Sequence, residues 1–231
     1  MVRKKIKMPI IRRKEIAKNT YEIRFGLKDK IVYSAGQYIV VILDKKTADE
    51  MGNRRSFSLS SSPENKKYIS TCFRLSEKHS EFKEYIMNVP LGTEVNVQGP
   101  LGEFALPKKA IEENIVLIAG GVGITPFISM LRDATHRKSS QKITLIYTDK
   151  SQERMGYYDE LVKLDFANPN FNFVNRFKRI DEDYIKKNCY FKNSIFYICG
   201  APGMVERAIK ILKKLKVNEE NIKVENFTGY K

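Results

Sequence analysis

The segment AGGVGITPFISML, Ala119 to Leu131, carries three glycines within four residues, and a short aliphatic run precedes it. Glycines allow a tight turn and let the backbone approach a bound group closely. A helix that begins there offers free backbone N–H groups, so a strand, a glycine turn and a helix together suit the binding of phosphate groups. Pro126 fits this interpretation because the first helical turn needs no N–H. The segment departs from the GxGxxG pattern, and glycines that serve only a tight turn remain the alternative.

A second strand end of the same kind lies in YICGAPGMVERA, Tyr197 to Ala208. Here Gly200, Pro202 and Gly203 separate an apolar run from an amphipathic helix. Two glycine-bearing strand ends in one parallel sheet would both lie at its carboxyl edge, where such folds bind ligands. The pair therefore favours a ligand site over two unrelated turns.

The residues that precede these motifs have the pattern of an all-β domain. Short runs of strand character, bounded by turn residues, occupy residues 10–17, 20–27, 36–43, 55–61, 67–75 and 93–100. Six such strands predict a small antiparallel barrel over residues 1–105. One helix interrupts them at residues 80–89, where Ser80 can cap the helix and apolar side chains share one face.

The remaining residues, 106–231, alternate between strands and helices. Strand patterns occupy residues 114–120, 142–149, 170–177 and 193–200, and helical patterns occupy residues 125–138, 157–165 and 203–217. This alternation predicts an α/β doubly wound domain with a parallel sheet. The boundary between the two domains is expected within residues 105–113.

Composition excludes several classes of protein. The three cysteines are far apart, none forms a CxxC pair, and only two histidines are present, which argues against a disulfide framework, a metal site and an iron–sulfur cluster. We expect a cytoplasmic protein without a signal peptide or a membrane span. Net charge is +15, and residues 1–30 hold 11 basic and 3 acidic residues. That basic patch would attract an acidic partner, although ordinary solvated surface charge explains it equally well.

Five short segments, in order, resemble motifs of the ferredoxin–NADP reductase superfamily. They are RSFS (55–58), GPLGEF (99–104), AGGVGITP (119–126), CGAPGMV (199–205) and ENFTGY (225–230). The resemblance covers nearly the whole chain and implies a flavin-binding β-barrel followed by an NAD(P)-binding domain. It also implies a flavin-dependent NAD(P)H oxidoreductase.

For the flavin, the resemblance implies that Arg55 pairs with a phosphate, since guanidinium binds phosphate oxygens in a bidentate manner. Phe57 would lie against the isoalloxazine ring in place of the tyrosine that the family usually has. Ser58 would place its hydroxyl near flavin N5. Two further contributions are implied, namely the backbone of Thr71 to Arg74, which includes Phe73, and the helix start at Ser80.

For the nicotinamide nucleotide, the resemblance implies binding at Gly121, Gly123, Ile124 and Thr125. Cys199 and Gly200 would flank the nicotinamide, and Cys199 is otherwise a small buried thiol. In the C-terminal segment, Glu225 would orient or relay protons, and Phe227 or Tyr230 would cover the other face of the flavin. Ordinary packing is the alternative for these three residues. The predicted catalytic residues are therefore Ser58, Cys199 and Glu225.

The expected activity is hydride transfer from nicotinamide to FAD, with FMN the less favoured flavin, followed by electron transfer to a separate acceptor. An acidic ferredoxin or flavodoxin suits the basic patch, and we expect a monomer. Asp149, after the strand at 142–149, would repel a 2′-phosphate and favour NADH, whereas Lys150 or Arg154 would favour NADPH; of the two, the pattern favours NADH. The alternatives are an electron-transfer subunit of a larger complex and a basic nucleic-acid-binding protein, which leaves the glycine motifs unexplained.

Overall fold

The computed structural model describes residues 5–44, 52–76, 80–109, 111–191 and 193–227. The first part of the chain forms six strands and one helix: β1 (Ile6–Ala17), β2 (Thr20–Gly26), β3 (Tyr38–Ile42), β4 (Arg54–Ser58), β5 (Tyr68–Arg74), α1 (Glu81–Asn88) and β6 (Glu94–Leu101). The strands pair antiparallel in the order β4-β3-β6-β1-β2-β5.

This sheet curls into a barrel until its edge strands meet. A backbone bridge joins Leu59, just after β4, to Thr71 in β5. Alternate side chains point inward, as Val95 and Val97 do in β6, and build an apolar core. The closure also brings Phe57 of β4 beside Phe73 of β5, with ring centroids 5.8 Å apart.

Helix α1 is held at both ends. At its start, the Ser80 hydroxyl accepts a hydrogen bond from the backbone N–H of Lys83. At its end, the Arg13 guanidinium of β1 donates to the carbonyls of Ile86 and Val89. The last turn of α1 has no basic residue of its own, so Arg13 supplies the cation that a helix C-terminus favours.

The second part of the chain is a parallel sheet with helices on both faces. Its elements are β7 (Asn114–Gly120), α2 (Ile124–His136), β8 (Ile143–Thr148), α3 (Tyr158–Ala167), β9 (Phe171–Arg176), α4 (Glu182–Asn188), β10 (Ser194–Gly200), α5 (Pro202–Lys214) and β11 (Ile222–Asn226). The strand order is β11-β10-β7-β8-β9, with every pair parallel. The order therefore reverses between β7 and β10, and ligands of such sheets bind at this switch point.

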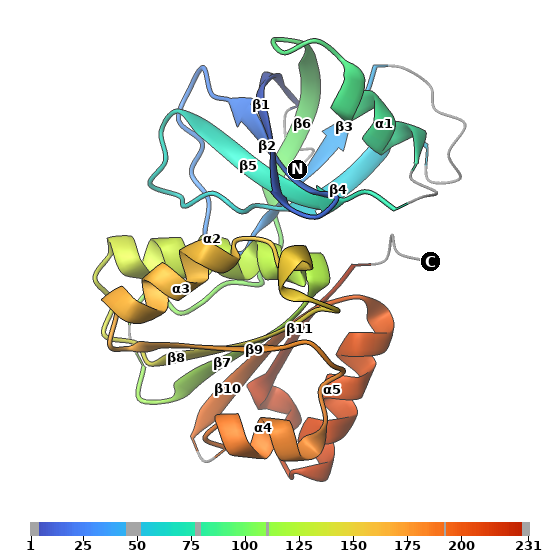
Figure 1. Ribbon diagram of the computed structural model, residues 1–231. Coiled ribbons are helices and arrows are strands. Elements are labelled where there is room, and N and C mark those ends of the chain that lie inside the picture. Colours follow the sequence, from blue (N-terminus) through green and yellow to red (C-terminus); the bar gives the residue numbers. More distant parts are fainter. Residues whose placement is uncertain (1–4, 45–51, 77–79, 110, 192, 228–231) are drawn as a thin grey trace.

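Figure 1 shows α2 and α3 on the face of this sheet that is turned towards the barrel, and α4 and α5 on the opposite face. Two separate apolar cores follow from this arrangement, one with α2 and α3 and one with α4 and α5. Strand β7 is buried on both faces, which explains its unbroken aliphatic sequence.

The predicted fold class is confirmed, an antiparallel barrel followed by a doubly wound α/β domain. Two elements, α4 and β11, were not predicted as a helix and a strand. The barrel sheet ends at Leu101 and the parallel sheet begins at Asn114, and the division at residue 105 stays a prediction. Within the described ranges, no helix has both the length and the apolar character needed to cross a membrane.

Candidate functional site

The two glycine-bearing strand ends touch each other at the switch point. Gly121–Gly123 forms a 3-10 turn directly after β7, and α2 follows at once. A Cβ placed on Gly123 would lie 2.1 Å from the carbonyl oxygen of Cys199, and one on Gly200 would lie 3.1 Å from the carbonyl oxygen of Gly120. At Gly123 all the nearest atoms belong to the backbone, so the close approach of the two chains requires glycine there, whereas at Gly200 the nearest atom is the flexible end of the Met204 side chain, at 2.4 Å.

A cavity of about 980 Å³ opens at this edge of the parallel sheet. It extends from the first glycine loop to the residues that follow β8 and β9 and to the start of α5. Its charged lining is almost entirely basic, with one carboxylate, and consists of Arg74, Asp149, Lys150, Arg154, Lys178, Arg179 and Arg207. A long anionic ligand fits this lining.

The three predicted catalytic residues lie together where the two domains meet. Cys199 of β10 is paired in register with Glu225 of β11, and Ser58 ends β4 of the barrel. The Ser58 hydroxyl is close enough to Glu225 to influence the pKa of its carboxyl group. Among the described residues, Ser58 Oγ and Glu225 Oε2 lie near each other and are buried, but neither atom forms a hydrogen bond of normal geometry. Buried polar atoms are almost always paired in proteins, so both atoms are available to a polar group of a ligand that reaches them.

The protonation of this cluster is set by burial. Burial raises the pKa of Glu225 to about 7, and the Ser58 hydroxyl acts in the opposite direction. Burial also raises the pKa of the Cys199 thiol well above its ordinary value, and the negative charge of Glu225 adds to this shift. Cys199 is fully buried and is therefore a neutral thiol near pH 7.

The predicted flavin residues of the barrel also share one region. Phe57 is half-buried and lies against Phe73 and Phe82, with centroid distances of 5.8 and 6.0 Å. The Arg55 guanidinium lies over the Phe82 ring at 5.1 Å. Helix α1, which Ser80 caps, carries Phe82 in its first turn, so an aromatic surface, a cation and a helix N-terminus occur side by side.

The other predicted cofactor-binding residues, for the nucleotide and for the flavin, are placed differently from one another. Gly121 lines the cavity, whereas the Ile124 and Thr125 side chains are buried in the domain. Phe227 packs against the apolar core that contains α2, and its N–H donates to the Gly200 carbonyl at 3.2 Å. Tyr230 lies outside the described residues.

One site feature was not anticipated from the sequence. The Arg74 side chain leaves β5 of the barrel and reaches the cavity, where Nη2 lies 2.7 Å from Asp149 Oδ2. The predicted repulsion between Asp149 and a 2′-phosphate is therefore countered by an adjacent cation. No periodicity within either domain predicts this contact, because it joins two elements that are 75 residues apart.

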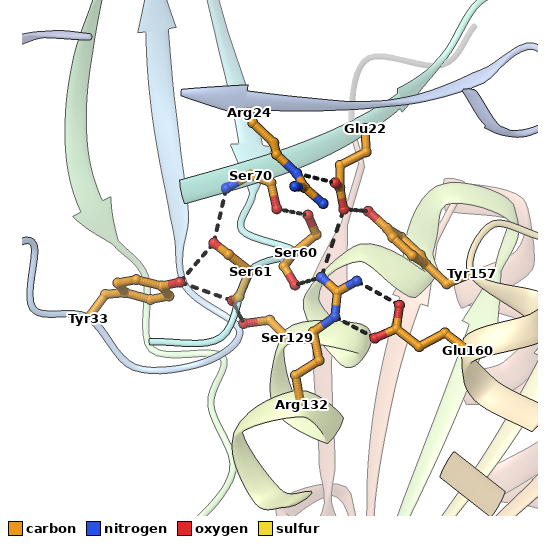
Figure 2. Close-up of polar contacts among 10 residues, drawn as sticks. All are labelled: Glu22, Arg24, Tyr33, Ser60, Ser61, Ser70, Ser129, Arg132, Tyr157 and Glu160. Atoms are coloured by element: carbon orange, nitrogen blue, oxygen red, sulfur yellow. Dashed lines mark hydrogen bonds and ion pairs between the residues drawn. The ribbon is translucent and has the colours of Figure 1, made fainter. Parts of the chain in front are cut away.

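A second cross-domain contact holds the barrel against α2 (Figure 2). Arg132 of α2 donates to both carboxylate oxygens of Glu160 at 2.6 and 2.7 Å and to the Ser60 carbonyl at 2.7 Å. Its Nη1 also lies 3.8 Å from the buried Glu22 carboxylate, which accepts from the Tyr157 hydroxyl at 3.1 Å. The signal in the sequence that could have revealed this contact was Arg132, which is the first charged residue after the uncharged run from Ile115 to Leu131.

We expect the substitution Arg132→Met to lower the free energy of unfolding by about 2 kcal/mol, because the buried Ser60 carbonyl loses its donor and the buried Glu22 carboxylate keeps only Arg24 as an ion-pair partner among the described residues. The matched control is Arg137→Met, directly after α2, which removes a partly exposed pair with Asp133 and should cost less than about 1 kcal/mol. Urea denaturation of both variants measures the difference. Equal costs would show that Arg132 does not hold the two domains together.

Comparison with known proteins identifies both domains. Residues 7–106 match the family described as the oxidoreductase FAD-binding domain, and residues 117–210 match the oxidoreductase NAD-binding domain. The two matches cover the barrel and most of the parallel-sheet domain in the order in which they occur in the chain.

Curated relatives include a subunit of the Na(+)-translocating NADH-quinone reductase from several bacteria. The Pseudomonas aeruginosa protein is 29% identical over 202 residues, which are 76% of this chain and 49% of that protein. The Klebsiella pneumoniae protein is 30% identical over 201 residues, again 76% of this chain and 49% of that protein. The chain thus spans about half the length of the curated relatives it matches.

Solved structures share the fold over nearly the whole chain. Ferredoxin-NADP+ reductase from Plasmodium falciparum superposes with a TM-score of 0.81 at 24% identity and covers 96% of each chain. A cytochrome P450 reductase from Amycolatopsis superposes with a TM-score of 0.83 at 22% identity over 97% of this chain and 71% of that chain. These likenesses concern the two-domain architecture.

Proposed function

Since the chain belongs to the ferredoxin–NADP reductase superfamily, we propose that it passes hydride from a nicotinamide nucleotide to FAD and then delivers electrons to a separate acceptor such as ferredoxin or flavodoxin. The observation that carries the proposal is the meeting of Ser58, from the FAD-binding barrel, with Glu225 at the carboxyl edge of the parallel sheet. A donor that occupies that edge and an acceptor that lies on the barrel would be in contact there.

The residues present fit a flavin. Phe57 offers a half-buried aromatic face, and Arg55 lies beside the start of α1. Ser58 Oγ and Glu225 Oε2 are buried polar atoms that would gain partners from the polar edge of the ring. FAD, when bound, supplies a ring nitrogen that accepts hydride and releases electrons singly or in pairs.

The chain itself supplies orientation and a proton acceptor. Arg55 would bind a flavin phosphate, and Phe57 would hold the ring in place. Gly123 and Gly200 keep the two backbones close, so that a nicotinamide can reach the barrel without obstruction by a side chain. Ser58 would orient the reacting edge by its hydroxyl. Glu225 would hold a proton at its carboxyl group, since its pKa of about 7 makes both protonation states available.

The surface of β1 supports an acidic acceptor protein. Lys5, Lys7, Arg12 and Lys14 are exposed there, and the exposed Ile6 and Ile11 lie among them. In the part of the chain that the structure describes, none of the four cations forms an ion pair with a carboxylate. A basic surface with apolar side chains suits a transient electron-transfer partner of opposite charge.

We expect the second-order rate of reduction of an acidic ferredoxin or flavodoxin to fall steeply as salt is raised from low to physiological concentration. The charge reversal Arg12→Glu together with Lys14→Glu should lower the low-salt rate by about tenfold. Stopped-flow absorbance measures both. Reduction of a small uncharged quinone serves as the control and should keep its rate in the variant, because a neutral acceptor does not respond to the charge reversal. Rates that do not depend on salt would exclude this acceptor surface.

A second candidate function is favoured by the relatives. Because the curated relatives are named as subunits of a larger reductase and are about twice as long as the matched region, the chain could work as the NADH-oxidising subunit of a complex. Rapid turnover of the isolated chain with ferredoxin would argue against this candidate. Reduction by NADH with no turnover of any soluble acceptor protein would favour it.

A further inference from the structure

The carboxylate of Asp149 is fully engaged within the protein. Its side chain is only 5% exposed, and its two oxygens lie 2.7 and 3.4 Å from the Arg74 guanidinium. Oδ1 also accepts from the Lys150 N–H at 2.7 Å and lies 3.5 Å from Arg154 Nε. A carboxylate with these partners has little capacity left to accept hydrogen bonds from a ribose diol, and its negative charge is offset.

Arg74 is fixed in this position by the barrel. Its Nε donates to Thr20 Oγ1 at 2.9 Å, and a second donor reaches the Arg154 carbonyl. A Cβ on Gly121 would lie 3.6 Å from Arg74 Nη1 and 3.8 Å from Asp149 Oδ2, so this ion pair sits directly beside the first glycine loop. A residue of the FAD-binding domain thereby controls the charge at the nucleotide site of the other domain.

The rest of the cavity is strongly positive. Lys150, Lys178, Arg179 and Arg207 line it, and among the described residues none of them has a carboxylate within ion-pair distance. Arg74 and Arg154 add two more positive charges, and Asp149 contributes the single negative charge. The net positive charge of the lining therefore exceeds the two negative charges of a dinucleotide pyrophosphate. The excess matches a ligand that carries a further phosphate.

We propose that Arg74 determines nucleotide selectivity: by neutralising Asp149 across the domain boundary, it lets the cavity accept a 2′-phosphorylated nucleotide, NADPH, in addition to NADH. This inference rests on the proposed function, because it concerns the donor of the same reaction. Arg74 acts through Asp149 and is a positioning residue with respect to the ligand.

The test uses binding of 2′,5′-ADP and 5′-AMP to the flavin-loaded protein, measured by isothermal titration calorimetry. The unchanged protein should bind 2′,5′-ADP about tenfold more tightly than 5′-AMP. Arg74→Gln should weaken 2′,5′-ADP binding by about tenfold and leave 5′-AMP binding within about twofold. Arg74→Gln with Asp149→Asn should restore 2′,5′-ADP binding, and Asp149→Asn alone should strengthen it.

The matched control is Lys163→Gln on the exposed face of α3, which removes the same charge outside the cavity and should change neither affinity. Equal affinity of the unchanged protein for both ligands overturns the inference, as does an equal loss of both in Arg74→Gln without rescue by Asp149→Asn. Asp149→Asn keeps the test decisive even if Arg74→Gln folds poorly. Reduction of the flavin by NADH in the same samples separates the two claims, because its failure would overturn the proposed function and this inference with it.

Discussion

Gly123→Ala should lower the rate of flavin reduction by NADH by about a hundredfold or more, while the barrel should keep its flavin. The added Cβ would lie 2.1 Å from the Cys199 carbonyl oxygen and 2.7 Å from Gly200 Cα, and both are backbone atoms that no rotamer change can move. The loops after β7 and β10 must therefore separate, and a shift of about 1 Å at a reacting centre costs about a hundredfold. Anaerobic stopped-flow absorbance measures the rate, and the visible flavin spectrum reports cofactor retention.

The comparison variant is Gly203→Ala, which adds the same methyl group at the lining of the cavity but away from the contact between the two loops. Gly203 lies in the first turn of α5, and a Cβ there meets no atom within 4 Å. Alanine is the better helix former, so the thermal midpoint should stay the same or rise slightly. Unchanged reduction kinetics in Gly123→Ala would mean that the contact between the two loops does not position the nucleotide.

Glu225→Gln should lower turnover with an electron acceptor by about a hundredfold, which is the usual contribution of a positioned acid or base. In the unchanged protein, turnover should rise as the pH rises through about 7, because passing both electrons to the acceptor releases the proton that came with the hydride, and only the ionised carboxyl group can accept it. The variant should lose this pH dependence along with the rate. Turnover between pH 5.5 and 8.5 measures both effects, and Glu220→Gln at the exposed surface is the control.

The same carboxyl group links stability to pH. Its folded pKa of about 7 exceeds the ordinary value of 4.5, so the fold favours the protonated form. The stabilisation is complete below the ordinary pKa and is lost as the pH rises from about 4.5 through about 7, by up to about 3 kcal/mol. Urea denaturation of the flavin-free protein should show this decline, and Glu225→Gln should not. If the turnover rate of Glu225→Gln still changed near pH 7, the titration would belong to another group.

The sequence predicted the fold because local pattern and topology agree. The alternation of apolar and polar residues in β6 and the continuous apolar run of β7 are both present in the sequence, and the burial of each strand follows these patterns. The short helix α4 and the strand β11 escaped prediction for physical reasons. Helix α4 has seven residues and one buried side chain, and β11 is an edge strand with none buried, so neither has a strong apolar period.

For the candidate site as well, the sequence predicted the features that follow from local motifs and missed those that depend on domain packing. Ser58, Cys199 and Glu225 were placed by the order of motifs, and the structure brings them together where the domains meet. The contacts that join the domains could not be predicted from local pattern, since Arg74 with Asp149 and Arg132 with Glu22 are distant in sequence and depend on how the two domains pack. Asp149 is an example. A carboxylate alone is expected to repel a phosphate, but the cations that contact Asp149 in the folded protein offset its negative charge.

The most direct test is anaerobic titration of the purified, FAD-supplied protein with NADH and then NADPH, followed by visible absorbance. The account predicts a yellow protein whose flavin band bleaches after about one equivalent of nucleotide. A protein that stays colourless when FAD is supplied, or a yellow protein that neither nucleotide bleaches, would contradict hydride transfer at the junction of Ser58, Cys199 and Glu225.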